Sequence, residues 1–384
     1  MINKILIRNY KSIANLEIEL GRLNIFIGEN GCGKTNILEA IGCCSIVADT
    51  ESSSLTEALM SLRGIRITEP HLMKSAFNSI SEEDVSQDML LMNPGLITDI
   101  FLSNQFNEEF GIRIHNYKHG TWMAELGMNN LRDKTKDYVE SIKNSSQFIP
   151  VSKYKPYFKC MFGEDSISSF FNYAPENYFL RRFEEEGQLK PLGIRGEGLF
   201  KHLMDIYKKD PKLLEKIGEK LRLISWFRGF EIPKDLVFTE RRINIKDKYL
   251  QELNFFDQRS ANEGFLYLLF YFTLFISPYS STFFSIDNID NALNPKLCTE
   301  LTKQLVILAK ENNKQVILTT HNPAILDGLN LSDNEQRLLT IYRNADGHTV
   351  AKRISEARKV KGVENVRLSE AYIRGYLGGL PKNF

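Results

Sequence analysis

One short segment near the start of the chain combines residue types that bind phosphate. Residues 28–35 read GENGCGKT and match the pattern G-x-x-x-x-G-K-[ST]. In such a loop, glycines let backbone N–H groups curl around phosphate oxygens, and the following helix presents its positive end to the same anion. Lys34 is suited to reach the β- and γ-phosphates of a nucleotide, and Thr35 to ligate Mg²⁺. We therefore predict nucleotide binding by Glu29, Asn30, Gly31, Cys32, Gly33, Lys34, Thr35 and Asn36.

A strand before this phosphate-binding loop (P-loop) and a helix after it are what the motif requires, and the sequence on both sides fits them. The apolar run LNIFI at residues 23–27 predicts a buried strand that leads into the loop. Residues 35–47 predict a helix that leads out of it. Towards the other end, residues 283–286 and 315–320 predict strands, and residues 295–312 predict a helix. Alternating strands and helices at both ends predict a parallel sheet covered by helices.

Two residues follow the later strands at the positions where ligands meet a parallel sheet. Asp287 comes directly after residues 283–286, and a P-loop needs a second acidic residue there to hold Mg²⁺. Alone, it could equally be a turn residue or a helix N-cap. His321 follows residues 315–320 and could contact a γ-phosphate, although an isolated His is more often a surface or core residue. We predict that Asp287 binds the metal together with Thr35.

These motifs, in this order, resemble the ATPase head of the ABC superfamily, in the branch of RecF, the SMC-type heads and the OLD-type AAA ATPases. The opening segments IRNYKSI and LNIFIGENGCGKTNILEAI are very similar to that branch. IDNIDNALNP resembles its Walker B motif and D-loop, and ILTTHNPAILD resembles its His switch. The resemblance implies an α/β fold, an ABC-type P-loop head with a mixed or parallel sheet, and ATP with Mg²⁺ as ligands.

The resemblance also implies a head-to-tail dimer in which ATP lies between two copies. The second face of each ATP site is a signature segment that usually contains Ser-x-Gly before a helix. Residues 260–265 (SANEGF) match it, with Asn262 in place of the usual Ser, followed by Glu263 and Gly264. The amide of Asn262 could donate a hydrogen bond to a γ-phosphate. An ordinary helix N-terminus is the alternative interpretation.

The chain departs from the family at the residue after the Walker B Asp. The family usually has a Glu there that polarises the attacking water, whereas this chain has Asn288. An amide cannot accept a proton, so general-base help is lost. We predict slow ATP hydrolysis, or ATP as a structural and switching ligand, with Asn288 and His321 as the candidate catalytic residues. Asp290, two residues further on, is expected to point elsewhere. A general base supplied by the partner copy remains an alternative. Gln105 is a weak candidate for the family's Q-loop glutamine.

Composition narrows the function classes. Lys and Arg number 49 and Asp and Glu 48, so the formal charge of +1 disfavours a protein that grips nucleic acid with its whole surface. The five Cys form no C-x-x-C pair, which argues against zinc sites and a disulfide framework. The most apolar stretch, residues 265–278, is too short to span a bilayer, and the start lacks a signal-peptide pattern. We expect a cytoplasmic protein.

The middle of the chain differs from its ends in character. We predict an ABC-type ATPase head over residues 1–47 and 237–345, an inserted α/β and helical region over 48–236, and a basic C-terminal segment over 346–384. Within the insertion, residues 110–126 predict two strands around residues 118–120, and residues 199–226 predict helices broken at Asp210-Pro211. A helix is expected to open at Ser260. The basic run at residues 353–374 is a candidate contact for nucleic acid or protein.

Two functions fit these features. In the first, a homodimer or higher homo-oligomer acts as an ATP-gated sensor or scaffold that controls a separate nuclease or toxin. The resemblance implies this because short ATPases of the branch often serve bacterial anti-phage systems such as Septu or PARIS. The chain has no nuclease motif, and the segment after His321 is too short for the Toprim domain of OLD proteins. The second function is a RecF-like DNA repair ATPase, and a transport ATPase is disfavoured.

Overall fold

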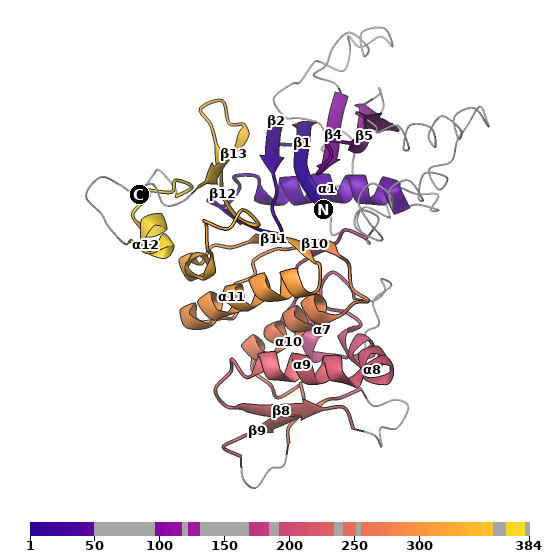
Figure 1. The fold of residues 1–384 in the computed structure, drawn as a ribbon, viewed down its shortest axis with the longest axis vertical. Helices are drawn as coiled ribbons and strands as arrows, with labels where there is room; N and C mark the ends of the chain where they lie inside the picture. Colours follow the sequence, from indigo (N-terminus) through magenta and orange to yellow (C-terminus); the bar gives the residue numbers. More distant parts are fainter. Residues whose placement is uncertain are drawn as a thin grey trace, which may run out of the picture.

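The described residues form two large β-sheets and a separate two-stranded sheet (Figure 1). The computed structural model describes residues 1–49, 97–116, 122–130, 169–183, 192–233, 241–250, 255–355 and 366–380. The first sheet contains, in spatial order, β2 (Ile13–Glu19), β1 (Ile2–Tyr10), β4 (Ile97–Asn104), β5 (Glu109–Asn116) and β6 (Trp122–Asn129). The second contains β13 (Thr349–Ile354), β12 (Gln336–Arg343), β3 (Leu23–Ile27), β11 (Gln315–Thr319), β10 (Phe283–Ile286) and β7 (Asn172–Tyr173).

The two sheets differ in strand direction. All neighbours in the first sheet are antiparallel. In the second, β12, β3, β11, β10 and β7 run parallel, and only β13 is antiparallel to its neighbour. Because parallel strands end at the same edge, the residues that follow β3, β10 and β11 meet there. The predicted α/β fold with a mixed sheet is confirmed.

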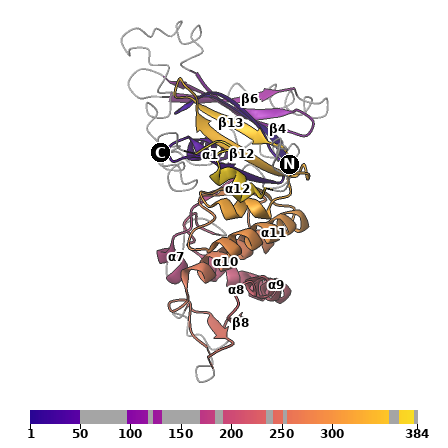
Figure 2. The ribbon, with the colours of Figure 1, turned by 90° about the vertical axis from the view of Figure 1, so that its left-hand side faces the viewer.

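Helix α1 (Lys34–Asp49) lies between the two sheets and joins them into one core (Figures 1 and 2). Its buried side chains, among them Ile37 and Ile41, share a cluster with Ile5 of β1 and Phe26 of β3. The strand β3 is buried along its whole length. Its Ile25 and Ile27 belong to a second hydrophobic cluster, on the other face of the parallel sheet. The P-loop between β3 and α1 is therefore held by packing on both of its flanks.

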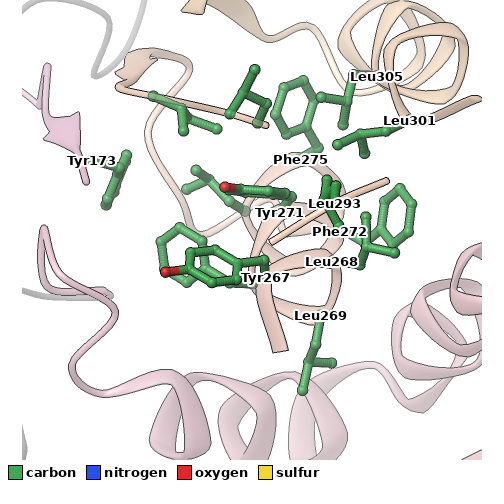
Figure 3. Close-up of a cluster of buried hydrophobic side chains, with 14 of the residues drawn as sticks. Tyr173, Tyr267, Leu268, Leu269, Tyr271, Phe272, Phe275, Leu293, Leu301 and Leu305 are labelled. Atoms are coloured by element: carbon green, nitrogen blue, oxygen red, sulfur yellow. The ribbon is translucent and has the colours of Figure 1, made fainter. Parts of the chain in front are cut away.

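The other face of the parallel sheet packs against helices around α10 (Glu263–Ile276), and Figure 3 shows buried side chains of this cluster, among them Leu268 and Tyr271. Every residue of α10 from Phe265 to Ile276 is buried, so the most apolar stretch of the sequence is a core helix. Its neighbours are α7 (Asn177–Arg181), α9 (Pro211–Leu221) and α11 (Pro295–Glu311), and α8 (Leu199–Lys209) packs against α9. No helix in the described ranges is long and apolar enough to cross a membrane.

Side-chain caps fix where several helices begin. Asp210 caps α9 by accepting from Lys212 N, and Pro211 takes the first helical position, so the predicted break at this pair is observed. The predicted helical run stops at Leu221 rather than Trp226, because the chain turns into β8 (Phe227–Glu231), which pairs with β9 (Asn244–Asp247). The helix expected at Ser260 begins at Glu263, since the side chain of Asn262 provides the cap.

Segments predicted to lie outside the head share its sheets. β4, β5 and β6 from residues 48–236 extend the sheet of β1 and β2, and β7 from the same stretch pairs with β10. The two strands expected within 110–126 are present, while residues 118–120 between them lie outside the described residues. The segment 346–384 contributes β13 and α12 (Leu368–Ile373). The predicted domain boundaries stay a prediction.

A buried histidine on α8 makes the stability of this fold depend on pH. His202 is 1% exposed, and its Nε2 has no hydrogen-bond partner among the described residues. Burial lowers the pKa of His202 to about 4, helped by Lys314 and Lys209 and opposed by Asp205. As the pH falls from 6.5 towards 4, the unfolded chain binds a proton that the folded chain does not, so folded-state stability is lost in this window.

We expect the free energy of unfolding to fall by about 2 kcal/mol between pH 7 and pH 5 through His202 alone. Urea denaturation of the native chain and of a His202→Gln variant at both pH values measures this contribution, because other titrating groups are common to both proteins. An equal loss in the two proteins would show that His202 does not carry it.

Candidate functional site

The P-loop connects the carboxyl end of β3 to the start of α1. Gly28 has φ of +152°, and a Cβ at this position would lie 2.1 Å from the carbonyl oxygen of Ile341 on the neighbouring β12. Only glycine fits so close to another backbone. The first glycine of the motif is thus needed for the sheet packing as well as for the turn.

Lys34 is the first residue of α1 and lies inside the loop that precedes it. Its side chain is 7% exposed, and Nζ donates to the carbonyl oxygens of Gly28 at 2.8 Å and Glu29 at 3.0 Å. The ammonium group is thus held beside the N-terminal end of the helix. Positive charge from both sources meets at one point, which favours an anionic ligand.

A cavity of about 520 Å³ opens at this point, within the size range of small-molecule sites. It is lined by Lys11, Asn30, Gly31, Cys32, Gly33, Lys34, Thr35, Asn36, Glu39, Asp287, Asn288, His321 and Arg343. The structure therefore brings the P-loop candidates together with Asp287, Asn288 and His321. Glu29 does not line the cavity, but its backbone carbonyl oxygen accepts the hydrogen bond from Lys34 Nζ.

The far wall of the cavity is the carboxyl edge of β10 and β11. The Thr319 hydroxyl donates to the Asp287 carboxylate, and the backbone N–H of Asn288 donates to Thr319 Oγ1 at 2.9 Å. These two bonds hold the turn after β10, which contains Asp287 and Asn288, against the last residue of β11. Thr35 and Asp287 line the same cavity, and a hydroxyl and a carboxylate are oxygen ligands of the kind that Mg²⁺ prefers.

His321 and Asp290 behave differently at this edge. Burial, together with the charge of Lys34, lowers the pKa of His321, while Asp290 and Asp287 act in the opposite direction. The imidazole is therefore neutral at neutral pH and offers one donor and one acceptor. Asp290 accepts from Thr320 Oγ1 at 2.7 Å and does not line the cavity.

The signature candidates lie elsewhere. Asn262, Glu263 and Gly264 line a different cavity of about 700 Å³ at the start of α10, and the two cavities have no residue in common. The Asn262 side chain accepts from Phe265 N at 2.8 Å and so caps the helix, as an ordinary helix N-terminus would. Within a single chain, these three residues do not reach the P-loop cavity.

The structure adds three charged residues that the sequence reasoning missed. Glu39 lies one helical turn after Thr35, so the spacing of α1 could have placed it on the same face. Its carboxylate is buried and pairs with the Lys11 ammonium from the turn between β1 and β2. Arg343 follows no motif, and only the position of β12 beside β3 brings it to the cavity.

The structure places Gln105, the candidate Q-loop residue, away from the cavity. Gln105 is exposed in the turn after β4 and does not line the cavity. In the pairing of β1 with β4, Asn104 lies opposite Ile2, whereas the cavity lies at the Lys11 end of β1. Among the described residues, no group of three or more His, Cys, Asp or Glu side chains is placed to hold a metal ion.

Comparison with known proteins shows a family and related sequences for this chain. Residues 1–260 match the AAA ATPase domain family. The DNA replication and repair protein RecF of Clostridium kluyveri is 24% identical over 254 residues, which are 65% of this chain and 61% of RecF. RecF of Clostridium botulinum strain Eklund 17B is 42% identical over 53 residues, 14% of this chain and 15% of that protein. The chain thus spans about three fifths of the first relative's length.

A solved structure shows the same fold over nearly the whole chain. It is the crystal structure of an Smc head bound to the C-terminal winged-helix domain of ScpA, with a TM-score of 0.55 and 15% identity. The match covers 92% of this chain and 98% of that one. With an SMC-head-like α/β fold and a matching family model over most of its length, this chain belongs to the AAA ATPase domain family.

Proposed function

We propose that this protein binds MgATP at the P-loop cavity and uses it to hold two copies together, with slow hydrolysis. One observation carries the proposal. The cavity collects Lys34, Thr35, Asp287 and His321, while the signature candidates beginning at Asn262 line a different cavity. A complete site of the ABC type then needs the second copy.

Each residue has a role that follows from its position. Lys34 and the N-terminal end of α1 bind the phosphate oxygens. Thr35 and Asp287 hold Mg²⁺, which neutralises charge on the phosphates when bound. His321 is neutral and exposed at the edge of β11, so it is suited to hydrogen-bond a γ-phosphate oxygen from there. Asn288 lies where a general base would be needed, and its amide cannot take the proton.

The finer role that we propose is an ATP-gated sensor or scaffold. If hydrolysis is slow, bound ATP keeps the dimer or higher oligomer closed for long periods. A closed assembly can control a separate effector, a nuclease or a toxin, as expected for an anti-phage defence ATPase. This role rests on Asn288 and on the resemblance of the motifs.

A RecF-like DNA-binding repair ATPase is the second candidate. The observation that favours it is the similarity to RecF over 254 residues. The near-neutral charge and Asn288 argue against it. Duplex DNA binding that strengthens with ATP and weakens steeply with added salt would favour this function over the scaffold.

The experiment that tests the proposal measures nucleotide binding and mass on the same sample. We expect the purified chain to bind MgATP, to double its mass in light scattering when MgATP is added, and to stay doubled for many minutes. With MgADP, which lacks the γ-phosphate that bridges the two copies, the mass should stay that of the unliganded protein. A chain that binds no MgATP, or whose mass never responds to it, would contradict the proposal.

A further inference from the structure

The hairpin formed by β12 and β13 lies against the outer side of the P-loop. Thr349, the first residue of β13, is 1% exposed, and its Oγ1 donates to the carbonyl oxygen of Cys32 at 2.8 Å. Its backbone N–H donates to the carbonyl oxygen of Ser12, in the turn between β1 and β2, at 2.8 Å. One residue from the C-terminal part of the chain thus joins two N-terminal segments.

The side chains at this junction form a chain of hydrogen bonds with a fixed direction. Asn36 Nδ2 donates to Ser12 Oγ at 2.7 Å, and Ser12 Oγ lies 2.7 Å from Thr349 Oγ1. A hydroxyl has one proton to donate, and Thr349 gives its proton to Cys32. Ser12 must therefore be the donor to Thr349, so the chain runs from Asn36 through Ser12 and Thr349 to the Cys32 carbonyl.

This chain encloses the part of the P-loop that bears the binding groups. It starts on the residue after Thr35 and ends on the residue before Gly33. Gly33 has φ of +105°, and a Cβ there would lie 2.2 Å from Thr349 Oγ1, so the hydroxyl is packed directly against the loop. A second bond set comes from Arg343, whose Nε and Nη2 donate to the Gly31 carbonyl at 3.1 and 3.0 Å.

We infer that Thr349 is a positioning residue of the nucleotide site, which holds the Cys32–Gly33 peptide so that the following N–H groups face the phosphates. The inference rests on the proposed function and adds to it that the C-terminal hairpin of β12 and β13 helps to shape the P-loop. Thr349 itself does not line the cavity. It acts because a phosphate-binding loop binds tightly only when its donors are already oriented before the anion arrives.

The test is a set of isosteric substitutions with MgATP affinity as the readout. Thr349→Val keeps the shape and removes the hydroxyl, so we expect MgATP binding to weaken about tenfold, the loss of roughly one buried hydrogen bond. Thr349→Ser restores the hydroxyl and should bind within about twofold of the native chain. Thr340→Val is the matched control, since Thr340 on the same hairpin also donates to a buried carbonyl, that of Leu377, at 2.9 Å.

Two further comparisons separate positioning from a structural role and from failure of the proposed function. In a double-mutant cycle, Ser12→Ala with Thr349→Val should weaken binding little more than Thr349→Val alone, because both break the same chain. Equal weakening by Thr340→Val, or equal affinity of Thr349→Val and the native chain, would overturn the inference. If the native chain itself binds no MgATP, the proposed function fails instead.

Discussion

Replacing Asn288 with Glu is expected to raise the rate of ATP hydrolysis at least a hundredfold. Asn288 lines the P-loop cavity directly after Asp287, so a carboxylate there adds a proton acceptor beside the proposed metal ligand, where the native chain has an amide. General-base catalysis contributes about 10²- to 10⁴-fold. The backbone at Asn288 is left-handed, with φ of +52°, which Asn tolerates better than Glu. That strain is about 1 kcal/mol, smaller than the roughly 2.7 kcal/mol that a hundredfold gain represents.

The comparison variant is Asn288→Gln, which has the length and backbone strain of Glu without its basicity. Phosphate release measured for the three proteins under saturating MgATP should then rank Glu far above both amides. The same Glu variant should show a shorter-lived ATP-dependent dimer. Turnover of several per second by the native chain, or equal rates for Glu and Gln, would show that Asn288 does not limit hydrolysis.

The elements that build the P-loop cavity could be predicted from the sequence because their patterns are local. A wholly apolar run before the loop, a helix after it, and strands ending at Asp287 and near His321 each follow from neighbouring residues. Parallel strands then force these ends to one edge. The fold class followed from the same alternation of strands and helices.

What the sequence could not supply was the order of strands. Arg343 and Thr349 reach the P-loop only because β12 pairs with β3, across more than 300 residues of chain. Similarly, β4 and β5 join β1, so part of the region expected as an insertion extends an N-terminal sheet. Gln105 matches the Q-loop glutamine in residue type only. The register of β4 against β1 places it at the opposite end of β1 from the cavity. Long-range pairing leaves no mark on local periodicity.

The second large effect is expected from mixing two variants, neither of which should dimerise alone. Lys34→Ala removes the cation of the P-loop and should abolish detectable MgATP binding. Asn262→Asp keeps the helix cap, because Asp accepts the bond from Phe265 N as Asn does. Its new negative charge would face the triphosphate held by the other copy. We expect this variant to bind MgATP as a monomer, whereas Asn262→Ser, with the residue usual in the family, should still dimerise.

Neither variant alone should dimerise with ATP, but their mixture should. In a head-to-tail pair, one site combines the native P-loop of the Asn262→Asp copy with the native Asn262 of the Lys34→Ala copy, and the other site carries both defects. Energy transfer between fluorophores on the two amino termini, one on each variant, should therefore appear only when MgATP is added. If Lys34 and Asn262 acted within a single chain, every chain in the mixture would carry one defect, and no signal could appear. Because the two cavities share no residue within one chain, a signal from the mixture would show that the P-loop cavity of one copy meets the start of α10 of the other.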